Sequence, residues 1–185
     1  MFFTRFFALF FLFASFGIVT SNATVVQKRQ DTADVETVLN TLKSSTDVIL
    51  PQITSVAQSG NVSDATVAPL INELTAALNT ASSSLAALKT NDKARRQVAD
   101  LGVAVLVDEL LTEITTTLDG LLAVASGLPE IGGLFAGVDA ALHTVLGGLE
   151  TLLAGVLVLV ATLLGNVDGL LRSIGFGLTL ASLGL

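Results

Sequence analysis

The sequence feature that most constrains the fold is an uncharged apolar stretch near the C-terminus. The thirteen residues 152–164 read LLAGVLVLVATLL and lie between the charged residues Glu150 and Asp168. A helix needs about 20 apolar residues to cross a bilayer, so this stretch is short for a membrane span. We therefore expect it to be buried against the rest of the chain or at an interface.

The composition excludes several classes of protein. Of the 185 residues, 51% are hydrophobic, and the formal net charge is -7. Nucleic-acid binding needs a basic surface, which such an acidic chain does not provide. The sequence contains no cysteine, so it has neither a disulfide framework nor a thiol nucleophile.

The N-terminus predicts secretion. Residues 1–23 combine Arg5, a phenylalanine-rich apolar core and small residues at the end, which is typical of a signal peptide. Residues 24–29 then resemble a short propeptide that ends in the processing pair Lys28 and Arg29, which leaves Gln30 as the first mature residue. Whether the second pair, Arg95 and Arg96, is also cleaved stays open.

Residues 30–126 are predicted to form a hydrophilic helical bundle. Apolar residues recur at steps of three and four over residues 35–49, 67–88 and 98–121, which predicts three amphipathic helices. In the third, Leu101 and Val105 are expected to be buried. Pro51 is expected to kink or break the first helix. Asn61 begins the sequon Asn-Val-Ser in the following turn and is a predicted glycosylation site.

Residues 127–185 are predicted to be a hydrophobic, glycine- and leucine-rich helical half that packs on the bundle. After a loop at residues 127–133, we expect one long apolar helix over residues 134–164 and a short interfacial helix or irregular tail from Gly169. The predicted fold class is all-α, a small amphipathic bundle followed by this hydrophobic half. The residues expected to adsorb to surfaces are Leu152, Leu153, Val156, Leu157, Val158, Leu159, Val160, Leu163 and Leu164.

The sequence shows no catalytic motif and predicts neither an enzyme nor a cofactor or metal site. His143 is the only histidine, and Asp139 lies four residues before it, on the same helical face. Zinc would need further nitrogen or sulfur ligands, so a polar-face role is expected for His143. Asp108, Glu109, Glu113 and Asp119 match no calcium-binding loop, and we expect them on a solvated acidic face.

The order of these features resembles the cysteine-free secreted proteins of mushroom-forming fungi. The resemblance is carried by the signal peptide, Lys28-Arg29-Gln30, the segment DVETVLNTLKSSTDVILPQI, the sequon-bearing turn and the Leu-Ala-Ser stripe. It implies a matrix or cell-wall protein that helps aerial hyphae to form and to attach. Residues 30–125 also resemble the fungal hydrophobic surface-binding protein and cell-wall galactomannoprotein domain, which is a small helical bundle. The hydrophobic, glycine-rich C-terminal half does not share this resemblance.

The expected function is therefore that of a secreted, surface-active structural protein of the matrix or cell wall. Its expected partners are hydrophobic surfaces or the air–water interface, cell-wall polysaccharide or lipid, and further copies of the chain, with no nucleic acid. Two alternatives stay open at this point. One is a membrane protein that spans the bilayer through about residues 151–167, and the other is a secreted lipid-binding protein.

Overall fold

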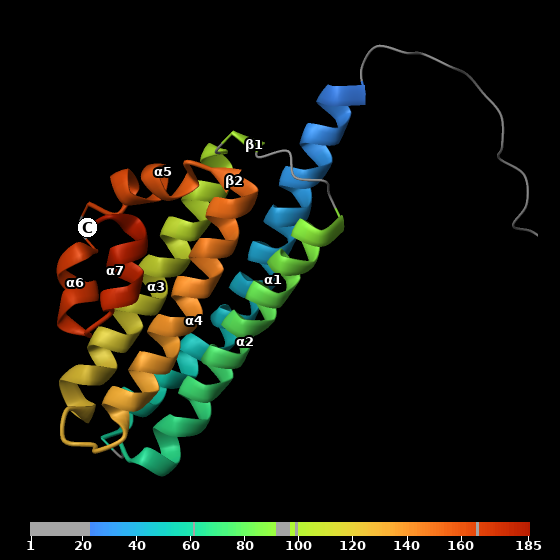
Figure 1. The fold of residues 1–185 in the computed structure, drawn as a ribbon. Coiled ribbons are helices and arrows are strands. Elements are labelled where there is room, and N and C mark those ends of the chain that lie inside the picture. The colour runs from blue at the N-terminus through green and yellow to red at the C-terminus, as the bar shows by residue number, and fades with distance from the viewer. Residues whose placement is uncertain (1–22, 61, 92–96, 99, 166) are drawn as a thin grey trace, which may run out of the picture.

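The computed structural model describes residues 23–60, 62–91, 97–98, 100–165 and 167–185 (Figure 1). Within these ranges, side chains are described for residues 33–60, 62–88, 100–165 and 167–185. The fold is all-helical, as the sequence predicted, and two strands of two residues each are the exceptions among the described residues. Residues 1–22 of the predicted signal peptide, Asn61, Arg95 and Arg96 lie outside the described residues.

In the described part of the chain, four long helices are followed by three short ones. The long helices are α1 (Ala23–Ser59), α2 (Asp64–Asn91), α3 (Leu101–Ala125) and α4 (Ile131–Leu152). The short helices are α5 (Val156–Leu163), α6 (Asp168–Ser173) and α7 (Gly177–Leu183), and the strands β1 (Gln97–Val98) and β2 (Leu153–Ala154) pair in parallel. Lys28 and Arg29 fall in the first turns of α1, where the backbone alone is described.

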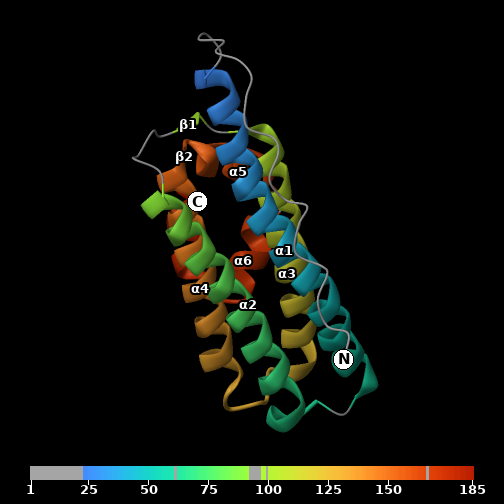
Figure 2. The same ribbon diagram turned by 90° about the vertical axis from the view of Figure 1, so that its right-hand side faces the viewer.

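The long helices form a bundle that is closed on three sides by direct packing. α1 packs against both α2 and α3, and α2 packs against α4. At the α2–α4 crossing, a Cβ atom on Gly148 would lie 3.4 Å from Cδ1 of Leu85, so the glycine allows the two helices to approach closely. On the fourth side, α5 and α6 pack on α3 while α7 packs on α4, and Figure 2 shows α6 between the ribbons of α3 and α4. We call the segment of residues 156–185 the C-terminal wedge.

Pro51 was predicted to kink or break the first helix, and the structure shows that it does not break it. α1 continues to Ser59, and the buried stripe runs past the proline through Ile49, Leu50 and Ile53. Pro51 itself is exposed. The carbonyl group that loses its hydrogen bond at a proline can therefore face water, while the burial of the stripe holds the helix together.

The buried face of α3 differs from the prediction at its first turns. Leu101 is 62% exposed and Val105 is 39% exposed, whereas Val103, Ala104 and Val107 are buried. The helical period, followed back from Leu111 and Ile114, reaches these three positions and not Leu101 or Val105. The predicted stripe was therefore out of phase at the start of the helix.

The long helix predicted over residues 134–164 is interrupted. α4 ends at Leu152, Leu153 and Ala154 pair with β1, and α5 begins only at Val156. Gly155 between them has φ +84°, a left-handed conformation that a glycine adopts without steric cost. The apolar pattern continues through this point, so periodicity alone did not reveal the break.

α4 is the one helix among the described residues that is long and apolar enough to cross a membrane. Half of its apolar window is buried inside the protein, as in the core helix of a globular bundle. The alternative span through residues 151–167 would need a continuous helix that the structure does not contain. That segment holds the end of α4, strand β2, the Gly155 turn and the eight residues of α5.

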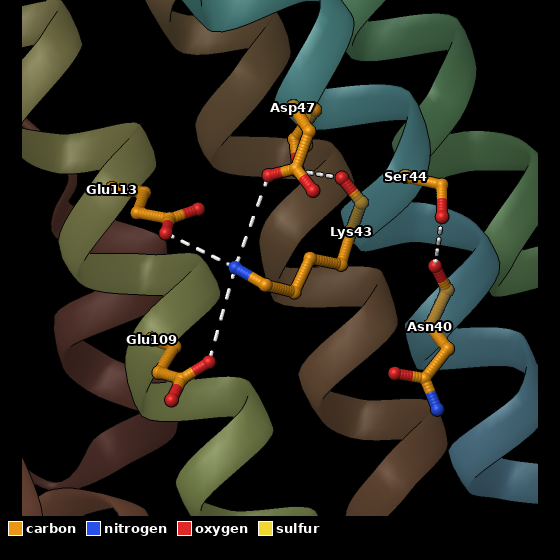
Figure 3. Close-up of polar contacts among 7 residues, drawn as sticks. Asn40, Lys43, Ser44, Asp47, Glu109 and Glu113 are labelled. Atoms are coloured by element: carbon orange, nitrogen blue, oxygen red, sulfur yellow. Dashed lines mark hydrogen bonds and ion pairs between the residues drawn. The ribbon is translucent and has the colours of Figure 1, made fainter.

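Lys43 connects α1 to α3 (Figure 3). Its ammonium nitrogen lies 3.0 Å from Oε1 of Glu113, 3.8 Å from Oε2 of Glu109 and 3.8 Å from Oδ1 of Asp47. The hydrogen bond to Glu113 raises the pKa of Lys43 above its usual value. Partial burial opposes this rise, and the charges of the three carboxylates add to it. The expected solvated acidic face is thus present at the exposed Glu109 and Glu113, whereas Asp108 and Asp119 are half-buried.

Replacing Lys43 tests this connection. Lys43→Met should lower the free energy of unfolding by about 1 kcal/mol, because surface ion pairs contribute up to that amount and the carboxylates would then repel one another. Lys43→Arg should keep most of the stability. Urea unfolding at low and at high salt measures the effect, and a loss that does not shrink in high salt would contradict an electrostatic origin.

Asp108 gives the fold a predictable dependence on pH. Burial, and next the charge of Glu109, raise the pKa of Asp108 above the ordinary value of 3.8, so the ionised carboxylate destabilises the folded state at neutral pH. Asp108→Asn should therefore raise the unfolding temperature at pH 7. The gain should shrink as the pH falls through the raised pKa and vanish below 3.8, where the carboxyl is protonated in both states. Thermal unfolding from neutral to acid pH, with the exposed Glu73→Gln as control, measures this difference.

Candidate functional site

The C-terminal wedge is almost free of charge. Its two charged residues, Asp168 and Arg172, lie one helical turn apart on α6 and pair with each other, with 2.7 Å between Nε and Oδ1. The side chains that the wedge buries are apolar apart from one threonine: Val156, Leu157, Val160, Leu164, Val167, Leu171, Ile174, Phe176, Thr179, Leu180 and Leu183. The wedge therefore joins the bundle mainly by burying apolar surface.

Phe176 is the largest fully buried side chain of the wedge. It is 0% exposed and packs edge-to-face on Phe135 of α4, with 6.3 Å between the ring centroids and an interplanar angle of 87°. Such aromatic pairs add stabilisation beyond that of the buried area. This contact fixes the start of α7 against α4.

Asp139 on α4 caps α7 from outside that helix. Its side chain is 5% exposed and accepts hydrogen bonds from the backbone N–H groups of Leu178 and Thr179, both at 2.9 Å, and from the Thr179 hydroxyl at 2.7 Å. Phe176 stands at the N-cap of α7 and has no side-chain oxygen to satisfy these N–H groups. The carboxylate of Asp139 supplies the missing acceptor and places a negative charge at the positive end of the helix.

His143 lies one turn after Asp139 and also reaches α7. Its Nδ1 is 2.5 Å from the hydroxyl oxygen of Ser182. That hydroxyl donates to the carbonyl of Leu178, so it can accept a hydrogen bond from an Nδ1–H group. Asp139 and His143, which the sequence places on one helical face, thus both hold the same short helix.

Two further carboxylates anchor the other short helices. Glu150, near the end of α4, accepts the backbone N–H of Gly155 at 2.9 Å and that of Leu157 at 3.3 Å, and so caps α5. Asp119 of α3 accepts a hydrogen bond of 2.6 Å from the hydroxyl of Ser173, the last residue of α6. Carboxylates of α3 and α4 therefore hold each short helix at one end.

A shallow open groove lies beside this site. It has a volume of about 340 Å³ between α2 and α4, and Ser82, Ala86, His143, Thr144, Gly147 and Gly148 line it. Among the residues whose side chains are described, no group of three or more His, Asp or Glu residues is placed to hold a metal ion.

The residues predicted to adsorb to surfaces are divided between the inside and the outside of the protein. Leu153, Val156, Leu157, Val160 and Leu164 are buried, Leu152 and Leu159 are partly buried, and Val158 and Leu163 are exposed. With Val158 67% exposed, α5 presents apolar surface to solvent in the closed structure. The buried members that belong to the wedge, Val156, Leu157, Val160 and Leu164, can reach an external surface only if the wedge moves away from the bundle.

Comparison with known proteins shows similarity to a fungal protein. The chain is 53% identical over 64 residues to fruiting body differentiation protein 16 of Flammulina velutipes. This match covers 35% of the chain, and the chain spans about half the length of that relative. No family model matches the sequence. The fungal part of the expected resemblance is thus supported.

Truncation of Asp139 tests how the wedge is held. Asp139→Ala leaves two N–H groups and a buried hydroxyl of α7 without an acceptor, so we expect a loss of about 3 kcal/mol in the stability of the wedge. Asp139→Asn keeps an acceptor oxygen and should lose less. Hydrogen exchange is the measurement: the amides of Leu178 and Thr179 should exchange faster, while those of α2 should not change. Unchanged exchange at α7, or an equal increase throughout the chain, would contradict the role of Asp139.

Proposed function

We propose that this chain is a secreted, surface-active structural protein of the extracellular matrix or cell wall, without catalysis, that adsorbs to hydrophobic interfaces by opening its C-terminal wedge. The observation that carries the proposal is the wedge itself. It is a segment without net charge, made of three short helices, which completes the bundle through apolar contacts and a few hydrogen bonds. The Gly155 turn joins it to α4.

The energy of apolar burial explains why such a wedge is closed in water and opens at an interface. Removing apolar surface from water contributes about 25 cal/mol per Å², or about 2.5 kcal/mol per 100 Å². In water, opening loses this term for the wedge and for the bundle face beneath it. At an air or oil surface the exposed side chains avoid water again, and an adsorbed area of a few hundred Å² offsets much of the roughly 5–15 kcal/mol that stabilises a domain.

The distribution of charge gives the opened molecule the character of an amphiphile. Among the residues whose side chains are described, Lys43 and Arg172 are the two basic residues, and the other charged residues are acidic and lie mostly on α1 to α4. The bundle thus favours water, whereas the wedge, with its single internal ion pair, favours the apolar phase. The predicted adsorbing residues from Leu152 to Leu164 lie where these two parts join.

The extracellular setting of this proposal rests on the sequence and on the similar fungal protein. The predicted signal peptide and the processing pair Lys28 and Arg29 support secretion. The name of the relative links it to fruiting body differentiation, a process that fits a role in aerial growth or attachment. Wall polysaccharide and lipid are further partners under this proposal, and Asn61 would carry a glycan on the water-facing half.

A cross-link that holds the wedge closed tests the function. The natural chain has no cysteine, so Asp119→Cys with Ser173→Cys introduces the only two thiols, at positions whose side chains touch. Bridging them with a short bis-maleimide ties α6 to α3. We expect the bridged protein to lose most of its adsorption to octadecyl-coated silica and most of its surface pressure at the air–water interface, because the wedge cannot open.

The matched control ties two bundle helices and leaves the wedge free. Lys43→Cys with Glu113→Cys replaces a pair in contact between α1 and α3, and the same reagent bridges it. This protein should adsorb as strongly as its unbridged form. Equal adsorption by the wedge-locked and the control proteins would show that the surface activity does not need opening, and it would overturn the proposed function.

A further inference from the structure

Opening the wedge uncovers a face of the bundle that lacks hydrogen-bond donors for one carboxylate and exposes apolar side chains. The buried carboxylate of Asp139 loses two N–H donors and one hydroxyl donor when α7 leaves. Water can solvate this carboxylate while the face is open, but covering it again without partners is costly, so the face favours a covering segment that restores those donors. It also exposes Phe135 and the other apolar side chains that α5 to α7 had covered.

We propose that the segment that refills this face is the wedge of a second copy of the chain, so that adsorbed molecules become linked by exchange of residues 156–185. This inference rests on the proposed opening of the wedge. The second copy brings the N–H groups of Leu178 and Thr179 and the Thr179 hydroxyl in the arrangement that Asp139 accepts. It also brings Ser182 for His143 and Phe176 for Phe135.

The exchange should change the free energy of the protein little, because the wedge carries no unpaired charge from one bundle to the other. Asp168 and Arg172 pair within the wedge and travel together. The polar contacts of α6 and α7 with the bundle are formed again, with the same residues, in the exchanged form. The N–H of Leu157, which Glu150 accepts in the closed form, belongs to the connection treated next. The balance between closed and exchanged chains therefore depends on the connection at Gly155 and on local concentration, which is highest where chains gather at an interface.

Under this proposal, the connection at Gly155 takes a helical conformation in the exchanged form. The apolar helical pattern continues through residues 152–164, and the closed structure interrupts it at Leu153 to Gly155. If these residues become helical, α4 and α5 join into one helix about 50 Å long. The N–H groups that Glu150 now accepts then bond within the helix, and the wedge is carried away from its own bundle toward a neighbour.

Two single-thiol chains detect the exchange directly. The Asp119→Cys variant and the ¹⁵N-labelled Ser173→Cys variant are mixed in equal amounts and adsorbed to octadecyl-coated silica. They are then treated with the short bis-maleimide and analysed by mass spectrometry. Exchange places the altered bundle position of one chain beside the altered wedge position of the other, as Asp119 and Ser173 lie in the closed chain. We expect labelled–unlabelled dimers well in excess of both homodimers, and mixed dimers no more abundant than homodimers would overturn the proposal.

Gly155→Ala provides an independent readout. A Cβ atom at this position meets nothing within 4 Å, so the substitution strains only the left-handed backbone of the closed form. It should raise the yield of mixed dimers roughly tenfold in the single-thiol backgrounds, the factor that corresponds to about 1.4 kcal/mol. Gly120→Ala, at an exposed helical glycine of α3 with equal space, is the control and should leave the yield unchanged. An equal yield for the Gly155→Ala and Gly120→Ala variants would overturn the role of this connection.

The outcomes separate this inference from the proposed function. Loss of adsorption by the wedge-locked chain, with no excess of mixed dimers among unlocked chains, overturns exchange and leaves surface activity by opening intact. An excess of mixed dimers, with full adsorption by the locked chain, supports exchange and overturns opening as the cause of adsorption.

Discussion

The hydrogen bonds of the Asp139 carboxylate fix how the last part of the chain lies on the bundle. α7 is a short helix whose N-cap residue, Phe176, is apolar, and on its own such a helix is marginal in water. Asp139 gives it a cap from a helix 40 residues away in sequence, and Phe135 gives it an aromatic neighbour. Because α7 lies on α4 while α5 and α6 lie on α3, this one attachment also helps to close the side of the bundle that the long helices leave open.

Much of the bundle could be predicted from the sequence because burial on one face leaves a helical period. The stripes of α1 and α2 and the all-α class follow from that period alone. The structure departs from the predicted breaks and continuations where tertiary packing outweighs a local signal. At Pro51, where a kink or a break was predicted, the buried residues on both sides keep the helix unbroken, and at Gly155 a left-handed turn ends a pattern that by itself favours continuation.

Only part of the candidate site could be predicted from the sequence. The apolar stretch of residues 152–164 stands out by composition, but composition does not say which of its side chains are covered, and Val156 and Val158 have opposite exposures. The carboxylates that hold the wedge could not be identified from the local sequence, because Asp139 and Asp119 form hydrogen bonds with residues 40 and 54 positions away. An acidic residue on the apolar side of a helix was the one available signal, because a buried carboxylate needs partners of its own.

Under the proposed function, stability and surface activity make opposite demands on the chain, and the wedge reconciles them. A bundle with no disulfide must bury its apolar surface to stay folded, whereas an adsorbing protein must be able to expose it. Here the two requirements fall on different segments. α1 to α4 keep a core among themselves, while the apolar surface of α5 to α7 is held by a few carboxylate anchors and a glycine turn. Those anchors end on backbone N–H groups and hydroxyls instead of on opposite charges, so among the described residues no buried ion pair has to be broken before the wedge moves.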